Sequence, residues 1–183
     1  PLPTLELLPV DSPDREARAR AVAEASWPET YRGLIPDAQI PYMISRMYAP
    51  ETIRRETAEG SPFFLLLADG RDAGICSFDL AKRGENASAE LHKVYLRPAY
   101  WGRGIVPEAA REVLRHAFED LQLACVWCAY NDGNEKSKRV QEKLGFQYQW
   151  TTEDAPVPLM SETRKGHVNL MTREEWLKGE YSC

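Results

Sequence analysis

One stretch, residues 90–108, constrains the fold of this chain more than any other. Its first half is rich in β-forming residues and predicts a strand that Pro98 ends. A tight turn with Gly102 and Gly104 follows, and Pro107 suits the first position of a helix. A strand, a two-glycine turn and a helix start in direct succession therefore form the centre of the predicted fold.

The glycine turn has the properties of an anion site. Glycines let backbone N–H groups approach an anion closely, and a helix N-terminus carries about half a positive charge. Arg103 adds a full charge. The glycine spacing is too short for a Walker loop, and Pro107 stands where the third glycine of the dinucleotide fingerprint belongs. The stretch predicts a phosphate or pyrophosphate ligand outside those two nucleotide-binding classes.

Composition narrows the class of protein. A chain of 183 residues, 43% hydrophobic and 28% charged, predicts one globular domain over residues 1–183. The net charge of -5 argues against nucleic acid as the main partner. No apolar run approaches the ~18 residues of a membrane span, and the first residues lack a signal pattern, which favours a cytoplasmic protein.

The cysteines indicate neither a disulfide framework nor a metal site. Cys125 and Cys128 lie three apart in a strand-like run, so their side chains point to opposite faces, and no second pair completes four ligands. They are expected to be core thiols, and no metal is predicted.

Strand and helix patterns alternate along the chain after a hairpin at Asp69-Gly70, which predicts a mixed α/β sheet flanked by helices. The segment 27–36, with two prolines and a glycine, breaks the first helical pattern; its aromatic residues either line a pocket or cap the core. The expected strands are 4–10, 63–68, 73–80, 90–96, 123–130, 146–151 and 167–171, and the expected helices begin at or near Pro13, Asp37, Pro50, Pro107, Asn134 and Thr172.

Two motifs resemble the GNAT superfamily of acyl-CoA-dependent N-acetyltransferases. VYLRPAYWGRGIVPEA, residues 94–109, is similar to that family's acetyl-CoA strand and pyrophosphate loop. NEKSKRVQEKLGF, residues 134–146, is similar to its N-x-x-S/A…E-K-L-G-F helix and turn. Trp101 stands in the first slot of the loop, as in the branch of ribosomal-protein alanine N-acetyltransferases, whereas TY-x-GLIP in the N-terminal half looks more like general small-amine members.

The resemblance implies a mostly antiparallel mixed sheet in which two parallel strands splay apart, near Leu96 and Tyr130. Pantetheine would bond to backbone groups of the first strand, the pyrophosphate would rest on the loop, and Asn134 would reach the pantetheine arm. The cofactor-binding residues predicted on this basis are Val94, Tyr95, Leu96, Trp101, Gly102, Arg103, Gly104, Ile105, Val106, Asn134 and Ser137.

Catalytic roles follow from the chemistry of amines. An alkyl amine has a pKa of ~10 and attacks a thioester only when neutral. Glu90 aligns with the base of some family members, and a narrow cleft would raise its pKa; the alternatives are an exposed edge-strand acid or a clamp on the substrate's charge. His92 either relays a proton, packs in the core or lies exposed at the surface. The Val94 N–H would stabilise the oxyanion. In the family, a tyrosine that acts as the general acid stands at the position of Gln141, which cannot donate a proton as an acid. Ser137 is therefore the candidate for that role; alternatively it caps or packs the helix.

These features predict direct transfer of an acetyl group from acetyl-CoA to a primary amine in a ternary complex. An acyl-CoA-binding regulatory module or pseudoenzyme is the alternative. A kinase would need a phosphate-contacting lysine and Mg²⁺ ligands, for which the chain offers no convincing set. Protein N-termini, polyamines, amino acids and aminoglycosides all stay open as acceptors, and the oligomeric state, a homodimer included, is open too.

Overall fold

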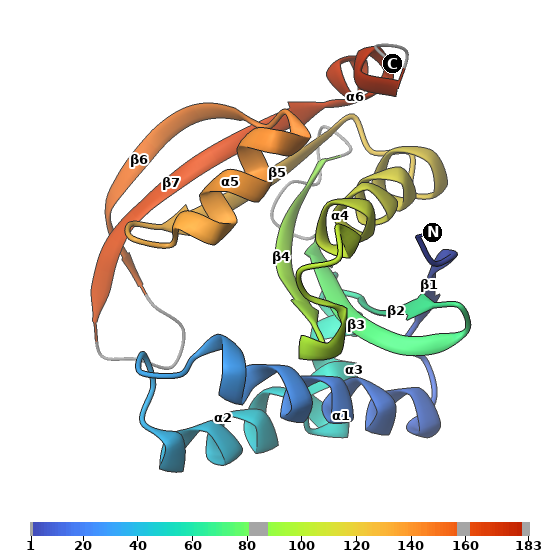
Figure 1. The fold of residues 1–183 in the computed structure, drawn as a ribbon, viewed down its shortest axis with the longest axis vertical. Coiled ribbons are helices and arrows are strands. Elements are labelled where there is room, and N and C mark those ends of the chain that lie inside the picture. Colours follow the sequence, from blue (N-terminus) through green and yellow to red (C-terminus); the bar gives the residue numbers. More distant parts are fainter. Residues whose placement is uncertain (1, 81–87, 157–161, 181–183) are drawn as a thin grey trace. The chain divides into compact units, whose positions relative to one another are not determined.

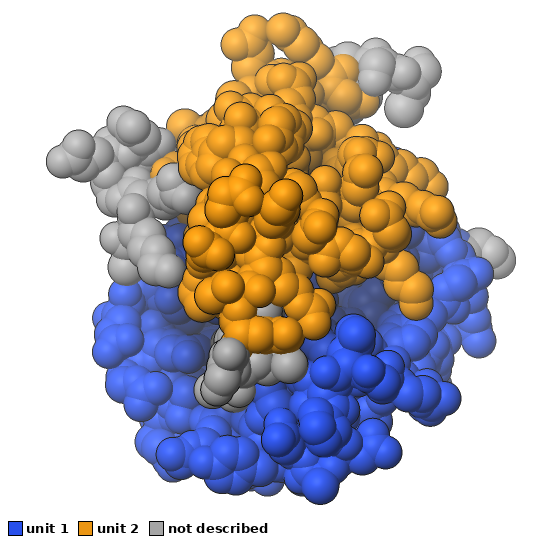
Figure 2. All heavy atoms as spheres, turned by 90° about the vertical axis from the view of Figure 1, so that its left-hand side faces the viewer, with its two compact units in different colours: residues 1–81, 91–113 blue, residues 82–90, 114–183 orange. Residues whose placement is uncertain are grey.

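The computed structural model describes residues 2–80, 88–156 and 162–180, and divides into two compact units (Figures 1 and 2). One unit comprises residues 1–81 and 91–113, and the other residues 82–90 and 114–183. Within these described residues, hydrogen bonds connect seven strands in the order β1-β2-β3-β4-β5-β7-β6. The pair β4–β5 is parallel, and β1–β2, β2–β3, β5–β7 and β6–β7 are antiparallel, so the predicted mixed, mostly antiparallel sheet is confirmed.

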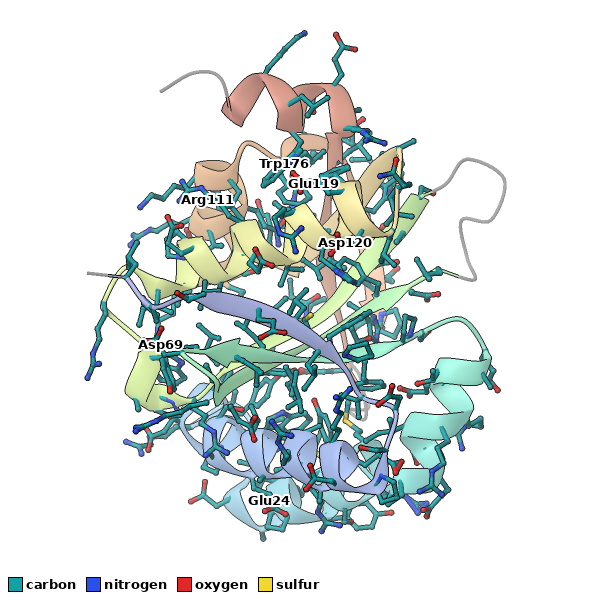
Figure 3. The ribbon with its side chains drawn as sticks, turned by 90° about the vertical axis from the view of Figure 1, so that its right-hand side faces the viewer. Glu24, Asp69, Arg111, Glu119, Asp120 and Trp176 are labelled. Carbon is teal, nitrogen blue, oxygen red and sulfur yellow. The ribbon has the colours of Figure 1, made fainter. Side chains whose placement is uncertain are left out.

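The first unit consists of antiparallel strands packed against helix α1. The turn between β2 and β3 is the predicted one: Asp69 and Gly70 have φ values of 49° and 77°, in the left-handed region that a tight hairpin requires. Asp69 lies at the tip of this hairpin (Figure 3). The elements are β1 (Leu5–Pro9), α1 (Pro13–Thr30), η1 (Asp37–Gln39), α2 (Ile40–Met47), α3 (Pro50–Ala58), β2 (Phe63–Ala68), β3 (Arg71–Asp79), the later part of β4 (Ser88–Leu96), η3 (Pro98–Tyr100) and most of α4 (Ile105–Arg115).

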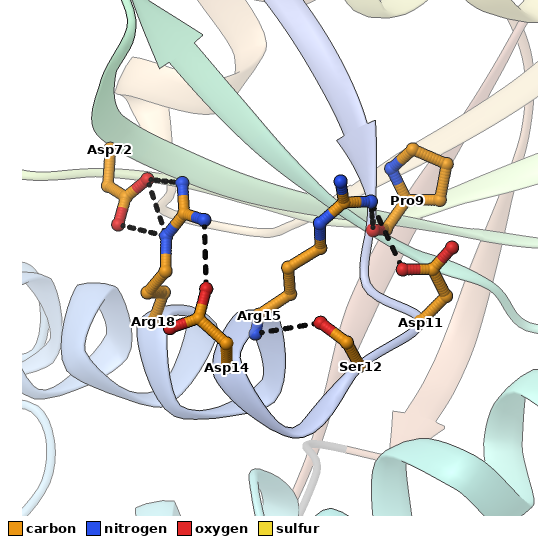
Figure 4. A network of polar contacts seen from close by, with 7 residues as sticks. All are labelled: Pro9, Asp11, Ser12, Asp14, Arg15, Arg18 and Asp72. Carbon is orange, nitrogen blue, oxygen red and sulfur yellow. Dashed lines mark hydrogen bonds and ion pairs between the residues drawn. The ribbon is translucent and has the colours of Figure 1, made fainter.

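Helix α1 is fixed at its start and along its side by polar contacts (Figure 4). Ser12 caps the helix by accepting a hydrogen bond from the Arg15 N–H, and Pro13 lies in the first turn, where the helix was expected to begin. Arg18 binds the carboxylate of Asp72 on β3 through Nε and Nη2, at 3.0 and 2.7 Å, and also contacts Asp14. This bidentate pair joins the helix to the strand.

The prediction that residues 27–36 interrupt the first helix is wrong over its first four residues. Helix α1 continues through Pro28 to Thr30. Trp27 is 2% exposed, and its ring lies 5.0 Å from that of Tyr31 and 5.6 Å from that of Tyr95. Burial of this aromatic cluster outweighs the one helical hydrogen bond that a proline removes. Of the two alternatives for the aromatic residues of this segment, packing against the core is therefore correct for Trp27.

The second unit is built on β5, β7 and β6, with α5 in contact with β5. The final helix begins near Thr172, as predicted, with a capping box in which Thr172 and Glu175 each accept a hydrogen bond from the other's backbone N–H. The last two strands are longer than predicted. The elements are the start of β4, a π-helical turn η4 (His116–Asp120), β5 (Cys125–Asn131), α5 (Glu135–Leu144), β6 (Gln147–Pro156), β7 (Thr163–Thr172) and α6 (Arg173–Glu180).

The predicted core thiols are less enclosed than expected. Cys125 and Cys128 are half-buried on β5, where Val126 is the one residue classed as buried. Desolvation, and after it the charge of Glu90, raises the pKa of the Cys128 thiol to about 12. In the described residues no three His, Cys, Asp or Glu side chains gather as a metal site, and no helix is both long and apolar enough to cross a bilayer.

Candidate acyl-carrier and acceptor site

The glycine turn of the first unit has the backbone conformation of an anion cradle. Gly102 and Gly104 have φ values of 73° and 70°, which L-residues rarely adopt, and both are exposed. A Cβ added at either position would meet no atom within 4 Å, so packing within the protein does not require glycine there. Helix α4 begins directly after the turn at Ile105. Open space beside a left-handed turn at a helix N-terminus fits a diphosphate bound by backbone N–H groups.

Side chains around the turn hold it in place. The Trp101 indole N–H donates to the Leu96 backbone oxygen at 3.0 Å, which ties the turn to the end of β4. Trp101 and Val106 also pack on a buried cluster that contains Leu96. Ile105 is buried at 4% exposure, whereas Arg103 is exposed. Trp101, Ile105 and Val106 thus support the turn from within, and Arg103 is the charged group at its surface.

The sequence predicts Pro107 as the first residue of the helix, but it is the third residue of α4. This position still belongs to the first turn, where backbone N–H groups have no acceptor within the helix. The proline therefore removes no helical hydrogen bond.

The parallel pairing of β4 with β5 is short. Its register joins Ser88, Ala89 and Glu90 to the start of β5 and ends there, opposite Trp127. Along the remainder of β4, within the described residues, no ladder bond from β5 occupies this edge of the strand. Val94, at 38% exposure, lies on this remaining part. In the described residues, the backbone groups of Val94 therefore have no ladder partner on β5.

The side chain of Tyr95 is hydrogen-bonded within the first unit. Its hydroxyl lies 2.5 Å from that of Tyr31. Burial raises the pKa of the Tyr95 phenol well above its usual value, with the nearby Tyr31 and Tyr48 adding to the effect. The backbone oxygen of Tyr95 lies toward β3, 2.6 Å from the position that a Cβ of Gly74 would take, and so faces away from the β5 edge. Sequence reasoning left the aromatic residues near Tyr31 undecided, and it had no signal for this hydroxyl pair.

Glu90 lies at the last paired position of β4, in register with Trp127. It is half-buried, and its charge raises the pKa of the Cys128 thiol on β5. His92, two residues further along, is exposed, which agrees with the surface alternative and not with core packing. Glu90 is therefore a carboxylate within β4, partly shielded from water, at the position where the pairing of β4 with β5 stops.

Helix α5 starts as predicted. The Asn134 side chain accepts from the Ser137 N–H at 3.3 Å and caps the helix, and Gly145 ends it in the left-handed region at φ 97°. The Asn134 carboxamide is thus engaged in capping, and Ser137 is half-buried one turn above it. The capping alternative considered for Ser137 applies to its backbone, not to its hydroxyl.

Two residues near Ser137 were missed or undervalued by sequence reasoning. Gln141 and Asn169 are each 5% exposed, and Asn169 Nδ2 donates to Gln141 Oε1 at 2.8 Å. Gln141 Nε2 in turn donates to the Ser137 hydroxyl at 3.1 Å. The one sequence signal was a lone asparagine inside the apolar run His167–Met171.

Several solved acetyltransferase structures share this fold. A structure described as that of an acetyltransferase aligns over 97% of this chain and 87% of its own, with a TM-score of 0.72 at 24% identity. A spermidine N-acetyltransferase from Vibrio cholerae aligns over 96% of this chain and 98% of its own (TM-score 0.70, 13% identity). The PaiA N-acetyltransferase from Thermoplasma acidophilum, solved in complex with coenzyme A, aligns over 92% and 99% (TM-score 0.68, 18% identity). At these identities the likeness concerns the fold.

Residues 4–147 match the family model of the acetyltransferase (GNAT) domain, and this chain belongs to that family. A Bacillus subtilis protein provisionally named a ribosomal N-acetyltransferase is 36% identical over 81 residues, which cover 44% of this chain and 43% of that protein. An Aspergillus fumigatus enzyme named FsC-acetyl coenzyme A-N(2)-transacetylase is 39% identical over 85 residues, 44% of this chain and 35% of the enzyme. The chain thus spans about half or less of the length of these relatives.

Proposed function

We propose that this chain transfers the acetyl group of acetyl-CoA to a primary amine by direct attack, as a single domain in the cytoplasm. The observation that carries the proposal is the turn at Gly102 and Gly104, left-handed, open where a Cβ would stand, and followed at once by α4. Family membership and the coenzyme A complex of one structural relative support it. The names of the relatives include protein and small-molecule acceptors, so the acceptor is proposed only as an amine.

The turn residues Gly102 to Val106 would hold the diphosphate through backbone N–H groups, with Arg103 contributing charge. Backbone groups of Val94 and Leu96 would bond to pantetheine along the edge of β4 beyond its short pairing with β5, with Tyr95 between them. Asn134 and Ser137 would contact the pantetheine arm and the sulfur from the start of α5. Acetyl-CoA supplies the acyl group as a co-substrate, and no metal is part of the proposal.

Glu90 would accept the proton of the incoming ammonium, because only the neutral amine is a nucleophile. The amine nitrogen then forms a bond to the carbonyl carbon, and the Val94 N–H would stabilise the negative charge on the carbonyl oxygen. The C–S bond breaks, its electron pair goes to sulfur, and Ser137 would stabilise the departing thiolate.

Release of CoA thiol in the presence of a broad panel of amines tests the proposal, together with calorimetric titration by acetyl-CoA. Binding and amine-dependent thiol release are both expected. Binding without release by any amine favours the alternative, an acyl-CoA-binding module. That alternative rests on Gln141, which occupies the slot of the family's tyrosine acid and cannot act as an acid. No binding at all removes both.

Glu90→Gln tests the base. The rate is expected to fall by about 10²–10⁴-fold near neutral pH and to approach that of the unmodified protein near the amine pKa of ~10, where the base is no longer needed. Glu24→Gln is the control, since Glu24 is an exposed carboxylate on α1 that pairs only with Arg20 among the described residues. Unchanged thiol release by Glu90→Gln leaves the transferase standing and removes Glu90 as its base.

A further inference from the structure

A chain of hydrogen bonds runs through the second unit from β7 to the start of α5. Asn169 on β7 donates to Gln141 Oε1 at 2.8 Å, and Gln141 Nε2 donates to Ser137 Oγ at 3.1 Å. Asn169 and Gln141 are both buried at 5% exposure. Buried carboxamides are costly unless their donors and acceptors are satisfied, so this chain has a defined arrangement.

Two backbone carbonyls determine the direction of every bond in this chain. Gln141 Nε2 lies 3.3 Å from the Ala129 backbone oxygen, and Asn169 Nδ2 lies 3.4 Å from the His167 backbone oxygen. A carbonyl oxygen only accepts, so each carboxamide must turn its NH₂ group toward its carbonyl. Rotating either one by 180° would bring two oxygens together. Both carboxamides are therefore locked in one orientation.

With Gln141 locked in this orientation, the Ser137 hydroxyl is free to donate its proton in a hydrogen bond. The two N–H groups of Gln141 Nε2 are used on the Ala129 oxygen and on Ser137 Oγ, so Gln141 can only donate to Ser137. In the described residues, no acceptor receives the Ser137 O–H. A hydroxyl that accepts from a fixed donor has its own proton directed elsewhere, because its lone pair already faces that donor.

We propose that Asn169 and Gln141 are positioning residues that hold the Ser137 O–H as a donor toward the sulfur of the leaving CoA thiolate. The inference rests on the proposed transferase function and deepens it. As the C–S bond breaks, both electrons go to sulfur and the Ser137 proton is shared with the thiolate but stays on oxygen, because a thiolate, with a thiol pKa of ~8.5, is a much weaker base than an alkoxide. The proton lost by the amine leaves through the base and the solvent.

Steady-state kinetics on four variants test the proposal: Ser137→Ala, Ser137→Thr, Gln141→Met and the double variant Ser137→Ala/Gln141→Met. Ser137→Ala is expected to lower kcat roughly 10- to 100-fold, the usual effect of removing a hydrogen bond to a charged group, with little change in the KM for acetyl-CoA. Ser137→Thr retains the hydroxyl and is expected to retain most of kcat. Gln141→Met is expected to lower kcat nearly as far as Ser137→Ala does.

The double variant decides between positioning and packing. If Gln141 acts through the serine hydroxyl, Gln141→Met has no further effect once Ser137 is alanine. If Gln141→Met lowers kcat by the same factor with and without the hydroxyl, Gln141 is merely structural and the proposal is overturned. Glu142→Gln, an exposed change on the same helix, is the control and is expected to leave kcat unchanged.

Should Gln141→Met fail to fold, Asn169→Asp serves instead. An aspartate cannot donate to Gln141 Oε1, so the Gln141 carboxamide loses the bond that holds it from β7 and no longer fixes the Ser137 hydroxyl. A fall in kcat close to that of Ser137→Ala is expected, and an unchanged kcat overturns the proposal. An unmodified protein that releases no thiol with any amine would instead refute the transferase function itself, whereas an active protein whose variants behave additively refutes only the positioning role.

Discussion

Replacing Gly104 by alanine separates the ligand-binding role of the glycine turn from its effect on stability. Gly104 has φ 70° and Gly70, in the β2–β3 hairpin of the same unit, has φ 77°. A Cβ at either position has no atom within 4 Å. The two substitutions therefore cause the same backbone strain and no clash, which makes Gly70→Ala a matched control.

The cost in stability is expected to be the same for both variants. A left-handed conformation costs an L-residue about 1–2 kcal/mol, and the loss of glycine's freedom in the unfolded chain returns about 0.4–1 kcal/mol. The net loss of about 1 kcal/mol corresponds to a fall in Tm of about 2–4 °C for a chain of this length.

The effect on acetyl-CoA binding is expected to differ. At Gly104 the added methyl group occupies the space proposed for the diphosphate and displaces it from at least one backbone N–H. A hydrogen bond to a charged group is worth about 1.5–3 kcal/mol, so Kd should rise by roughly 10- to 150-fold. Gly70→Ala should bind as the unmodified protein does.

Calorimetric titration with acetyl-CoA, with thermal unfolding measured in parallel, gives both quantities. The proposed diphosphate site is refuted if Gly104→Ala and Gly70→Ala lose equal stability and bind acetyl-CoA equally well. Weaker binding by both variants would instead indicate that general destabilisation is responsible.

Three further outcomes follow from contacts within the first unit. Arg18→Met removes the bidentate pair with Asp72 on β3 and is expected to lower Tm by about 2–4 °C. Arg20→Met is the control and is expected to leave Tm nearly unchanged, because its exposed partner Glu24 lies one helical turn away. Equal shifts in Tm would show that the pair with Asp72 does not stabilise the protein. Gly74→Ala places a Cβ 2.6 Å from the backbone oxygen of Tyr95, so chemical denaturation should report a loss of about 1–3 kcal/mol or more, and a loss below about 0.5 kcal/mol would contradict the close approach. Because burial raises the pKa of Tyr95, the folded protein keeps the Tyr95 proton at pH values where the unfolded chain has lost it, and stability should fall as pH rises above about 10. Tyr95→Phe should make this fall less steep when unfolding is measured over a series of alkaline pH values. An unchanged slope would argue against burial of the Tyr95 phenol as the cause.

Features determined by neighbouring residues could be predicted from the sequence. The hairpin at Asp69-Gly70 and the turn at Gly102 and Gly104 both follow from glycine's access to the left-handed region, which a few residues suffice to indicate. The cap at Asn134 likewise depends on a donor only three residues away. These local rules position the loop and the start of α5.

Features that depend on distant residues could not be predicted in this way. The bond between Asn169 and Gln141 joins positions 28 apart, and it forms only because β7 pairs with β5 in one particular register. The end of α1 was misjudged for a related reason, since Pro28 is a local stop signal that burial of Trp27 among distant aromatic rings outweighs. Sequence patterns report local preference, and these two cases were decided by tertiary packing.

The short ladder between β4 and β5 has a consequence for how specificity is divided in this protein. Hydrogen-bonding groups at that edge belong to the main chain, and a substitution changes a side chain while leaving the peptide unit in place. If acetyl-CoA binds there as proposed, its recognition can persist while side chains elsewhere diverge to suit different acceptors. The main chain at this edge would then bind the same molecule whatever the acceptor, and side chains elsewhere on the surface would select the acceptor.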